Sequence, residues 1–478
     1  MASYAIPEPD QSIIDRRSAI VRRLRKIAGP ANVIDDEVGR RAFETDALTA
    51  YARVPLAVVL PESTEEISRI LKFCHDEGIK VVARGAGTSL SGAALPAEDA
   101  IVVGVSKMNQ VLEIDYENRF ARVQSGVTNL AISDAVADQG FFYAPDPSSQ
   151  LACTLAGNIA MNSGGAHCLK YGVTTNNILG VKMVLMSGEV VEIGGDAMDS
   201  PAYDLLALVV GSEGQFGIVT EATVRILRAS ESARPMLLGF ASAKSAGACV
   251  AAIIGAGIIP MAIEFMDKPA IKVCDDYSGA GYPLNSEALL IVEVDGSDEE
   301  ISEELDQIQR IARRFRPRTM RISQSKEESA AIWKGRKAAF GAMGHISEYY
   351  CMDGTIPLSR LADVLVEIGN ICREHRLAVA NIFHAGDGNL HPLILYDANN
   401  EEESQRAEQC GAEILKLCVE VGGCLSGEHG VGIEKRDLMR VQFGKADLDQ
   451  QMRIKTVFDP KWLLNPAKVF PLDDRLTL

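Results

Sequence analysis

The sequence predicts an α+β protein made of more than one packed unit. The chain has 478 residues, whereas a single domain usually has roughly 100–200. Strand and helix patterns alternate over residues 56–84, and short strand patterns continue to residue 226. From about residue 230, longer helical stretches alternate with strands. We therefore expect a mixed-sheet unit in the first half and a separate α+β unit after it.

The first half begins with a helix and a strand–helix–strand unit. Residues 12–28 carry apolar side chains at helical intervals. The apolar run over residues 56–60 predicts a buried strand, and Ser63 and Glu66 have the capping-box spacing of a helix start. A second strand over residues 80–84 leads into a glycine-rich loop.

The remaining predicted elements are short strands in the first half and long helices in the second. In the first half, the patterns predict strands over residues 101–105, 111–114, 121–124, 182–186, 190–193 and 217–226, and a helix near 129–139. In the second half, they predict helices over 299–314, 327–343, 358–375 and 402–421, a strand over 289–294, and two strands about a tight turn within 382–396.

Composition and charge exclude several classes of protein. Apolar residues make up 47% of the chain and charged residues 24%, as in folded globular proteins. The net charge of −17 repels phosphates, so we expect no nucleic-acid partner. The longest mainly apolar run, residues 249–265, is shorter than the roughly 20 residues that cross a bilayer. Ten cysteines without a C-x-x-C pair argue against disulfides and an iron–sulfur cluster. With no secretory core at the N-terminus, we expect a cytoplasmic protein.

Three clusters of small residues indicate a long, flat ligand. Residues 85–92 follow a buried strand directly, and glycine there lets backbone amides approach a phosphate. Their spacing fits neither G-x-G-x-x-G nor a P-loop. Residues 154–165 and 211–219 form the other clusters. Each loop alone is equally typical of a tight turn, but three together can cradle a ligand with a diphosphate at one end and a ring system at the other.

Two histidine-bearing segments form a second constellation. His384 and His391, in one segment, and His429, in the other, are three of the seven histidines. A turn over residues 386–389 lets His384 and His391 meet on neighbouring strands. With Glu428 they make a ligand set typical of a catalytic divalent metal. Core packing is the alternative for a single histidine, and a metal hydrolase is the alternative function if the glycine loops are only structural.

Taken in chain order, these segments resemble a known flavoprotein family. The segments are Pro61, Arg84–Gly92, Pro145–Ser149, Gly157-Asn158 with Asn162–Gly165, and Gly211–Gly214. They are similar to the FAD-binding domain of the vanillyl-alcohol oxidase/p-cresol methylhydroxylase (PCMH) family. The resemblance implies a two-part PCMH-type FAD-binding domain over residues 1–230. It also implies an α+β cap domain with an antiparallel sheet over 231–425, carrying the metal-ligand histidines, and a C-terminal segment over 426–478 that returns to the FAD domain.

The same resemblance implies non-covalent FAD, because the first loop lacks the histidine that attaches flavin in some members. The implied cofactor-binding residues are Pro61, Arg84, Gly85, Ala86, Gly87, Thr88, Ser89, Gly92, Pro145, Thr154, Gly157, Asn158, Asn162, Ser163, Gly165, Glu213, Gly217, Ile218, Val219 and Asn465. Lys468 lies in the same C-terminal segment as Asn465, which the resemblance brings close to the flavin.

The histidine segments resemble the D-2-hydroxyacid dehydrogenase branch of the family, which includes D-lactate and D-2-hydroxyglutarate dehydrogenases and the FAD-linked subunit of glycolate oxidase. This implies that His384, His391 and Glu428 bind zinc, manganese or iron, and that His429 is the catalytic base. An alcohol is too weak an acid for imidazole alone, but a divalent cation lowers the pKa of a bound oxygen. His429 can then take the proton while the hydride passes to flavin N5.

Arg336 and Cys351 bear on the substrate. By resemblance, Arg336 binds the substrate carboxylate, for which a planar guanidinium is suited. Relatives that accept a second carboxylate carry a lysine where this chain has Cys351, and an unpaired buried charge is costly. The resemblance therefore favours a small monocarboxylate, glycolate or D-lactate, over D-2-hydroxyglutarate.

The resemblance also implies partner subunits. Because the chain offers no cluster cysteines or membrane span, an iron–sulfur relay belongs to another chain. We expect flavin-containing and iron–sulfur partners that feed a quinone, with the protein associated through them with the inner face of the membrane. A flavin-carrying assembly subunit without turnover is the non-enzyme alternative.

Overall fold

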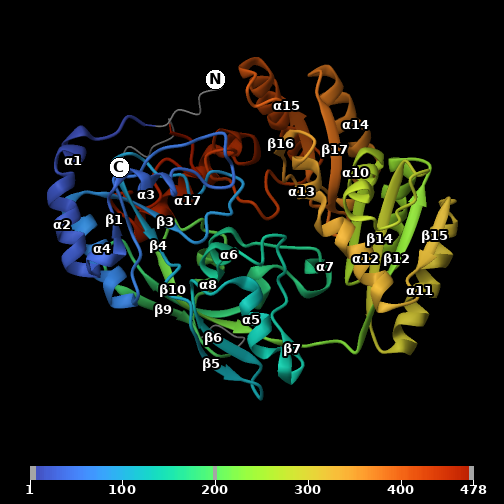
Figure 1. Cartoon of the computed structure of the whole chain (residues 1–478), viewed down its shortest axis with the longest axis horizontal. Helices are drawn as coiled ribbons and strands as arrows, with labels where there is room; N and C mark the ends of the chain where they lie inside the picture. Colours follow the sequence, from blue (N-terminus) through green and yellow to red (C-terminus); the bar gives the residue numbers. More distant parts are fainter. Residues whose placement is uncertain (1–6, 198–201, 473–478) are drawn as a thin grey trace. The chain divides into compact units, whose positions relative to one another are not determined.

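The computed structural model describes residues 7–197 and 202–472, and the chain divides into two compact units (Figure 1). The glycine-loop unit contains residues 85–92 and spans Ser3–Gly164, Gly172–Arg228 and Glu428–Leu478, apart from the undescribed positions. The histidine unit contains His384 and His391 and includes Gly165–Tyr171 and Ala229–Gly427. Residues 165–171, from the first half of the sequence, therefore pack with the second half. The predicted domain ranges 1–230, 231–425 and 426–478 stay a prediction.

A four-stranded sheet forms one part of the glycine-loop unit. Its order is β1-β2-β4-β3, in which β2, β4 and β3 are parallel and β1 is antiparallel to β2. Every residue of β2 and β4 is buried, as expected for parallel strands covered on both faces. The apolar side chains of α2 and α4 pack on one face of this sheet. The bounds are β1 Val33–Ile34, β2 Ala57–Val59, β3 Lys80–Arg84, β4 Ala100–Gly104, α2 Arg17–Ala28 and α4 Thr64–Glu77.

A five-stranded antiparallel sheet forms the other part of this unit. Its order is β5-β6-β10-β8-β9. Side chains from α5 and α6 join its core. The bounds are β5 Val111–Asp115, β6 Phe120–Gln124, β8 Ile178–Val184, β9 Val190–Gly194, β10 Ile218–Arg225, α5 Asn129–Val136 and α6 Leu155–Met161.

The C-terminal chain adds to the free edge of the four-stranded sheet. The Val81 amide donates to the Leu463 carbonyl at 2.8 Å, and the Asn465 amide donates to the Val81 carbonyl at 2.8 Å. The other elements of the unit are α1 Gln11–Asp15, α3 Glu37–Arg41, α8 Leu206–Val209, α16 Met439–Gln442, α17 Lys445–Phe458, the strand pair β7 Phe141–Phe142 and β11 Leu227–Arg228, and 3₁₀ turns at Pro30–Asn32, Ala137–Gln139, Thr174–Asn177 and Arg436–Leu438.

A seven-stranded antiparallel sheet organises the histidine unit. Its order is β15-β12-β14-β13-β17-β18-β16. The central strands β13 and β14 are almost entirely buried. The bounds are β12 Ser232–Phe240, β13 Ala262–Asp267, β14 Ala288–Gly296, β15 Thr319–Ile322, β16 Glu348–Cys351, β17 Ala378–His384 and β18 Pro392–Tyr396.

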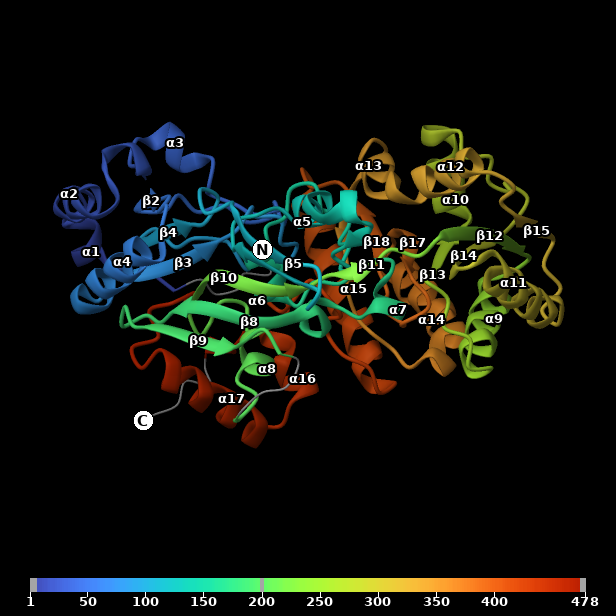
Figure 2. The same ribbon diagram turned by 90° about the horizontal axis from the view of Figure 1, so that it is seen from below.

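Helices cover both faces of this sheet. One face packs against α10, α12 and α13, while α9, α11, α14 and α15 contact the other (Figure 2). The bounds are α7 Cys168–Tyr171, α9 Ala243–Gly255, α10 Lys268–Ser278, α11 Asp298–Arg313, α12 Lys326–Lys337, α13 Ala339–Gly344, α14 Leu361–Glu374 and α15 Glu401–Glu420, with a 3₁₀ turn at Leu358–Arg360.

The α+β class is confirmed, and several predicted boundaries change. The predicted helix over 12–28 breaks at Arg16, and the one over 327–343 breaks at Ala338. In place of one mixed sheet, the first half has the four-stranded sheet, which is mixed, the five-stranded antiparallel sheet and the pair β11-β7. The predicted hairpin of 382–396 exists as β17 and β18, joined by a loop longer than a tight turn.

Candidate functional site

The first glycine cluster lies at the carboxyl edge of the parallel strands. Arg84 ends β3 and residues 85–92 follow it, and Pro61 comes two residues after β2. Ligands of parallel sheets bind at this edge. Gly87 and Gly92 have φ of 77° and 75°, which disfavours other residues. A Cβ on Gly85 would lie 2.3 Å from Thr154 Oγ1. The backbone of Gly85 therefore packs directly against Thr154 at the start of α6, and there is no room for a side chain at position 85.

The second cluster surrounds α6, and its side chains serve local structure. Thr154 caps α6 by accepting from the Gly157 amide at 3.4 Å. Asn158 Nδ2 donates to Asn129 Oδ1 at 2.7 Å, and Asn162 Oδ1 accepts from the Thr175 amide at 2.8 Å. The Pro145 carbonyl accepts from Asn129 Nδ2 at 2.8 Å, Ser163 follows α6, and predicted ligand Gly165 belongs to the histidine unit.

The third cluster joins the first two. The amides of Gly211 and Glu213 donate to carbonyls of α6 at 2.8 and 2.7 Å. The Glu213 carboxylate accepts from the amides of Val431 and Gly432 at 2.6 and 2.7 Å. Burial raises the pKa of Glu213 in spite of these hydrogen bonds. Of the other predicted residues here, Gly217 precedes β10, and Ile218 and Val219 begin it.

Asn465 connects these loops. Its Oδ1 accepts from the Ala83 amide at 2.9 Å, and its Nδ2 donates to the carbonyls of Glu213 and Gly214, both at 3.0 Å. The end of β3, the third glycine cluster and the C-terminal chain therefore meet at one side chain. The structure brings the three predicted clusters, apart from Gly165, together within the glycine-loop unit.

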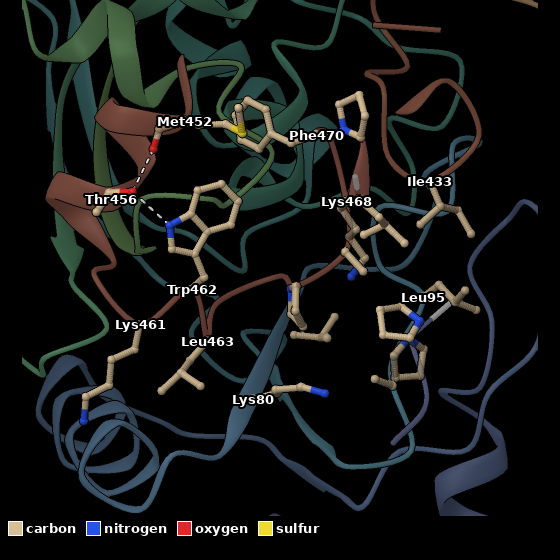
Figure 3. A pocket seen from close by; sticks show the side chains of 18 residues that line it. Lys80, Leu95, Ile433, Met452, Thr456, Lys461, Trp462, Leu463, Lys468 and Phe470 are labelled. Carbon is tan, nitrogen blue, oxygen red and sulfur yellow. Dashed lines mark hydrogen bonds between the residues drawn. The ribbon is translucent and has the colours of Figure 1, made fainter. Parts of the chain in front are cut away.

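Lys468 is buried beside these loops. Its side chain is 4% exposed, and its Nζ makes no hydrogen bond with the described residues. Burial lowers the pKa of Lys468 to about 7, although Asp46 and Glu213 favour the charged form. It lines a cavity of about 340 Å³ with Leu95, Trp462 and Phe470 (Figure 3). A buried amine beside apolar walls, next to a glycine cradle, fits a ligand that has both anionic groups and a flat ring, as FAD does.

His384 and His391 meet in the histidine unit. His384 ends β17, and His391 lies in the loop one residue before β18 rather than on it. Their ring centroids are 5.3 Å apart and the rings are nearly perpendicular. His384 Nδ1 lies 2.8 Å from Glu264 Oε1, and His391 Nδ1 lies 3.2 Å from the Met352 carbonyl. Both Nδ1 atoms face acceptors, so each neutral ring presents Nε2 as its lone-pair atom, which suits metal ligation.

Arg336 is buried and ion-paired. It is the last residue but one of α12, which ends earlier than the helix predicted over residues 327–343. Its Nε and Nη2 lie 2.8 and 2.6 Å from Glu264 Oε2. Burial would raise the pKa of Glu264, but Arg336 and His384 outweigh it and hold that pKa below its ordinary value. The side edge of the guanidinium is thus occupied, and its Nη1/Nη2 end is the edge suited to another carboxylate.

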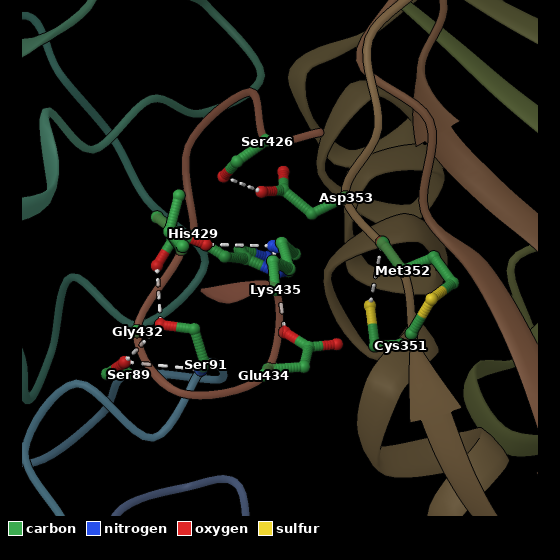
Figure 4. A network of polar contacts seen from close by, with 12 residues as sticks. Ser89, Ser91, Cys351, Met352, Asp353, Ser426, His429, Gly432, Glu434 and Lys435 are labelled. Atoms are coloured by element: carbon green, nitrogen blue, oxygen red, sulfur yellow. Dashed lines mark hydrogen bonds and ion pairs between the residues drawn. The ribbon is translucent and has the colours of Figure 1, made fainter. Parts of the chain in front are cut away.

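Glu264 was not predicted from the sequence. It links two residues that were, and a sequence signal existed, because an acidic residue within the apolar run Ala262–Met266 is unusual in a buried strand. Asp353 was also missed as a structural partner. It is fully buried and accepts from Ser426 Oγ at 2.5 Å and the Gly427 amide at 3.2 Å (Figure 4).

Glu428 and His429 begin the C-terminal part of the glycine-loop unit. Glu428 directly follows Gly427, and its Oε2 accepts from the Gly164 amide at 3.1 Å. The His429 carbonyl accepts from Ser91 Oγ at 3.1 Å, so the first glycine loop holds this backbone (Figure 4). The predicted ligand and the predicted base are therefore adjacent in the chain and anchored to the glycine loops.

Cys351, the residue used to predict substrate size, ends β16. It is buried, and its Sγ lies 3.4 Å from the Met352 carbonyl. No disulfide joins the ten cysteines, all of which lie in the part of the chain that the structure describes. Nowhere in residues 7–197 and 202–472 is there a helix with both the length and the apolar character needed to cross a membrane.

Comparisons with known proteins cover almost the whole chain. Residues 55–194 match the FAD binding domain family, and residues 229–469 match the C-terminal domain of FAD linked oxidases. The glycolate oxidase subunit GlcD of Escherichia coli (strain K12) is 45% identical over 98% of this chain and 93% of the relative. The D-lactate dehydrogenase of Archaeoglobus fulgidus is 33% identical over 90% and 95%.

A solved structure supports the fold. Substrate-bound p-cresol methylhydroxylase superposes with a TM-score of 0.81 at 16% sequence identity, covering 98% of this chain and 99% of that one. At this identity the similarity concerns the fold alone. The predicted PCMH-type fold is therefore confirmed.

Proposed function

Because this chain belongs to the FAD-linked oxidase family and is an FAD-dependent oxidoreductase, we propose that it oxidises a small D-2-hydroxyacid, glycolate or D-lactate, to the 2-oxoacid. The names of its relatives support this substrate class. Membership of the FAD-linked oxidase family argues against the alternative hypothesis, a metal hydrolase. Bound FAD would supply the acceptor for the hydride that leaves the substrate Cα.

One observation carries the substrate class. Arg336, Glu264 and His384 form a continuous buried chain of contacts within the histidine unit. A carboxylate-binding arginine is thereby connected, through one side chain, to a histidine with the tautomer of a metal ligand. A 2-hydroxyacid has its hydroxyl oxygen one carbon away from its carboxylate, so a single small molecule can use both groups.

The chain's own residues take three roles in the proposed reaction. Arg336 binds the substrate carboxylate through its Nη1/Nη2 end, which fixes the direction of the Cα–H bond. His429 accepts the hydroxyl proton. A divalent ion held by His384, His391 and Glu428 would supply the Lewis acidity that makes this hydroxyl acidic enough. Two imidazole nitrogens and a carboxylate are a donor set that zinc, manganese and iron accept.

A monocarboxylate is favoured over a dicarboxylate. Cys351 is buried, and its thiol, unlike a lysine, provides no positive counter-charge for a second carboxylate. D-2-hydroxyglutarate is therefore the less favoured substrate. Since one relative is named as a subunit, we also propose that the electrons pass onward to flavin-containing and iron–sulfur partner subunits.

Anaerobic titration of the purified protein with 2-hydroxyacids tests the proposal. Glycolate or D-lactate should bleach the flavin absorbance, and a chelator should abolish the bleaching. D-2-hydroxyglutarate should bleach it only at much higher concentration. A yellow protein that no 2-hydroxyacid bleaches would support the alternative of a flavin-carrying subunit without turnover, and bleaching that survives full removal of metal would eliminate the metal role.

A further inference from the structure

We propose that Glu264 is a positioning residue that holds the metal ligand His384 and the substrate arginine Arg336 in one shared arrangement. The inference rests on the function proposed above and adds a residue that neither the sequence motifs nor the relatives' names point to. Glu264 would touch neither substrate nor metal and would act through its two partners.

The fold brings these residues together from three separate elements. Glu264 on β13 lies directly opposite His384 on β17 in the antiparallel register. Directly opposed residues on neighbouring strands point to the same face of a sheet. That face is the one covered by α12, which carries Arg336 in its last turn. Glu264 is 1% exposed, so water does not compete for its oxygens.

Each carboxylate oxygen has its own task. Oε1 lies 2.8 Å from His384 Nδ1, whereas Oε2 lies 2.8 Å from Arg336 Nε and 2.6 Å from Arg336 Nη2. A carboxylate only accepts hydrogen bonds, so it requires the hydrogen of neutral His384 to be on Nδ1. The lone pair is then on Nε2, the atom needed for a metal. The Arg336 contacts at the same time fix the plane of the guanidinium.

The chemistry explains why a carboxylate is required here. A glutamine has one acceptor oxygen and one donor NH₂ group. If its oxygen faced Arg336, its NH₂ would face His384 Nδ1 and favour the tautomer with the hydrogen on Nε2. If its oxygen faced His384, its NH₂ would face the guanidinium, where two donors oppose each other. In both orientations Arg336 loses its buried counter-charge.

The neighbouring strand offers a matched control. Glu293 on β14 pairs with Ala262, two residues before Glu264, and lies on the same face. It is also buried and also contacts α12, through Trp333 Nε1 at 2.7 Å, and it contacts His167 at 3.2 Å. It has no contact with Arg336 or His384 among the described residues. Glu293→Gln therefore removes a buried carboxylate that anchors the same helix but leaves the proposed arrangement intact.

The experiment compares Glu264→Gln and Glu293→Gln in the full FAD-loaded chain. After chelation, each protein is titrated with Zn²⁺ and with Mn²⁺, and the substrate dependence of flavin bleaching is then measured at saturating metal. We expect Glu264→Gln to weaken metal binding about 10–100-fold and to raise the substrate concentration for half-maximal bleaching about 10-fold or more, with unchanged FAD content. Glu293→Gln should match the wild type in both measurements.

Three results would overturn the proposal: wild-type metal affinity in Glu264→Gln, a wild-type substrate dependence in that variant, or the same losses in Glu293→Gln, which would indicate general packing of α12. If Glu264→Gln does not fold, Glu264→Asp decides the question. It keeps the charge but is too short to reach both partners, so metal binding and substrate dependence should both weaken, and wild-type behaviour in either would reject the inference. If the wild type binds metal but is not bleached by any hydroxyacid, the proposed function fails, and the metal titration still judges Glu264.

Discussion

The glycine-loop unit and the histidine unit build their candidate sites in opposite ways. In the glycine-loop unit, the predicted ligand residues Thr154, Asn158 and Asn162 use their side chains for caps and loop contacts. A cofactor in this unit would therefore be contacted mainly by backbone groups, in the space that the glycines leave open. In the histidine unit, the candidate site consists of side chains, and Glu264 contacts both Arg336 and His384.

This difference predicts different sensitivities to substitution. A site built from backbone is damaged when a Cβ is added, and a site built from side chains is damaged by a change of one functional group. Two side chains in the glycine-loop unit depart from its pattern. His429 is the proposed base, and Lys468 is the buried amine that lacks a hydrogen-bond partner among the described residues. Substitutions at His429, at Lys468 and at a loop glycine test whether the glycine-loop unit depends mainly on its backbone or also on these two side chains.

The largest effect is expected at His429. His429→Ala removes the proposed acceptor of the substrate proton, and loss of a general base typically lowers a rate about 10²–10⁴-fold. Its carbonyl contact with Ser91 Oγ involves the backbone only, so FAD and metal contents should stay unchanged. Single-turnover bleaching of the flavin measures the rate.

His75→Ala is the control for this prediction. His75 lies in the same unit, near the end of α4, and its ring contacts only the exposed Asp76 among the pairs described. We expect wild-type bleaching from it. A His429→Ala protein that bleaches at the wild-type rate would show that this unit contributes no side chain to proton transfer.

An intermediate effect is expected at Gly87. Gly87→Ala imposes a side chain at φ 77° and places its Cβ 2.1 Å from Arg84 Nη2. Arg84 cannot yield freely, because Nη1 donates to the Thr45 carbonyl at 2.8 Å and the guanidinium lies over Phe43. We expect FAD to bind about 10–100-fold more weakly, as measured by flavin release during equilibrium dialysis, since left-handed strain of about 1–2 kcal/mol adds to the clash.

Gly29→Ala is the control that separates the effect of backbone strain at positive φ from the effect of the Cβ clash with Arg84. Gly29 has a similar φ of 85°, but a Cβ there would meet nothing within 4 Å. This variant should lose stability by about 1–3 kcal/mol, because φ 85° with ψ 151° is a backbone region that essentially only glycine adopts, and it should keep its FAD affinity. Equal loss of FAD in both variants would mean that the first loop does not act as a backbone cradle.

The two sites also differ in how much of them the sequence reveals. The first and third glycine loops were predictable because each is a local pattern directly after or before a strand, and the fold then brings them together at Asn465. The β17–β18 hairpin was predictable for the same reason. Glu264 was not, because it lies 120 positions from His384 and 72 from Arg336. Its role depends on the strand order β14-β13-β17, which periodicity cannot provide.

Helix boundaries failed where a local break interrupts an otherwise continuous pattern. The apolar spacing over residues 327–343 continues through Ala338, although the chain ends α12 there and begins α13. This break puts Arg336 in the last turn of a helix, where it reaches the sheet. A periodicity argument places a residue on a helix face, whereas the end of the helix is set by the packing below it.

The smallest effect is expected at Lys468, and it depends on pH. The pKa of Lys468 is lowered to about 7 by burial, so the amine is charged at pH 6 and mostly neutral at pH 8. In the unfolded chain the lysine keeps its proton to about pH 10.4. The unfolded state therefore binds more protons between these two pKa values, and the FAD-free chain gains stability as pH rises through that window.

A bound anionic cofactor favours the charged form of the Lys468 amine, so FAD affinity should fall as pH rises through 7. Lys468→Met should bind FAD about 10-fold more weakly at pH 6 and little differently from wild type at pH 8. Lys461→Met is the control, because Lys461 lines the same cavity but donates to the His75 carbonyl at its exposed end, and it should follow the wild-type profile. A wild-type FAD affinity that is flat from pH 6 to 8 would mean that Lys468 contributes no charge to the cofactor, and the glycine-loop unit would then bind it through backbone alone.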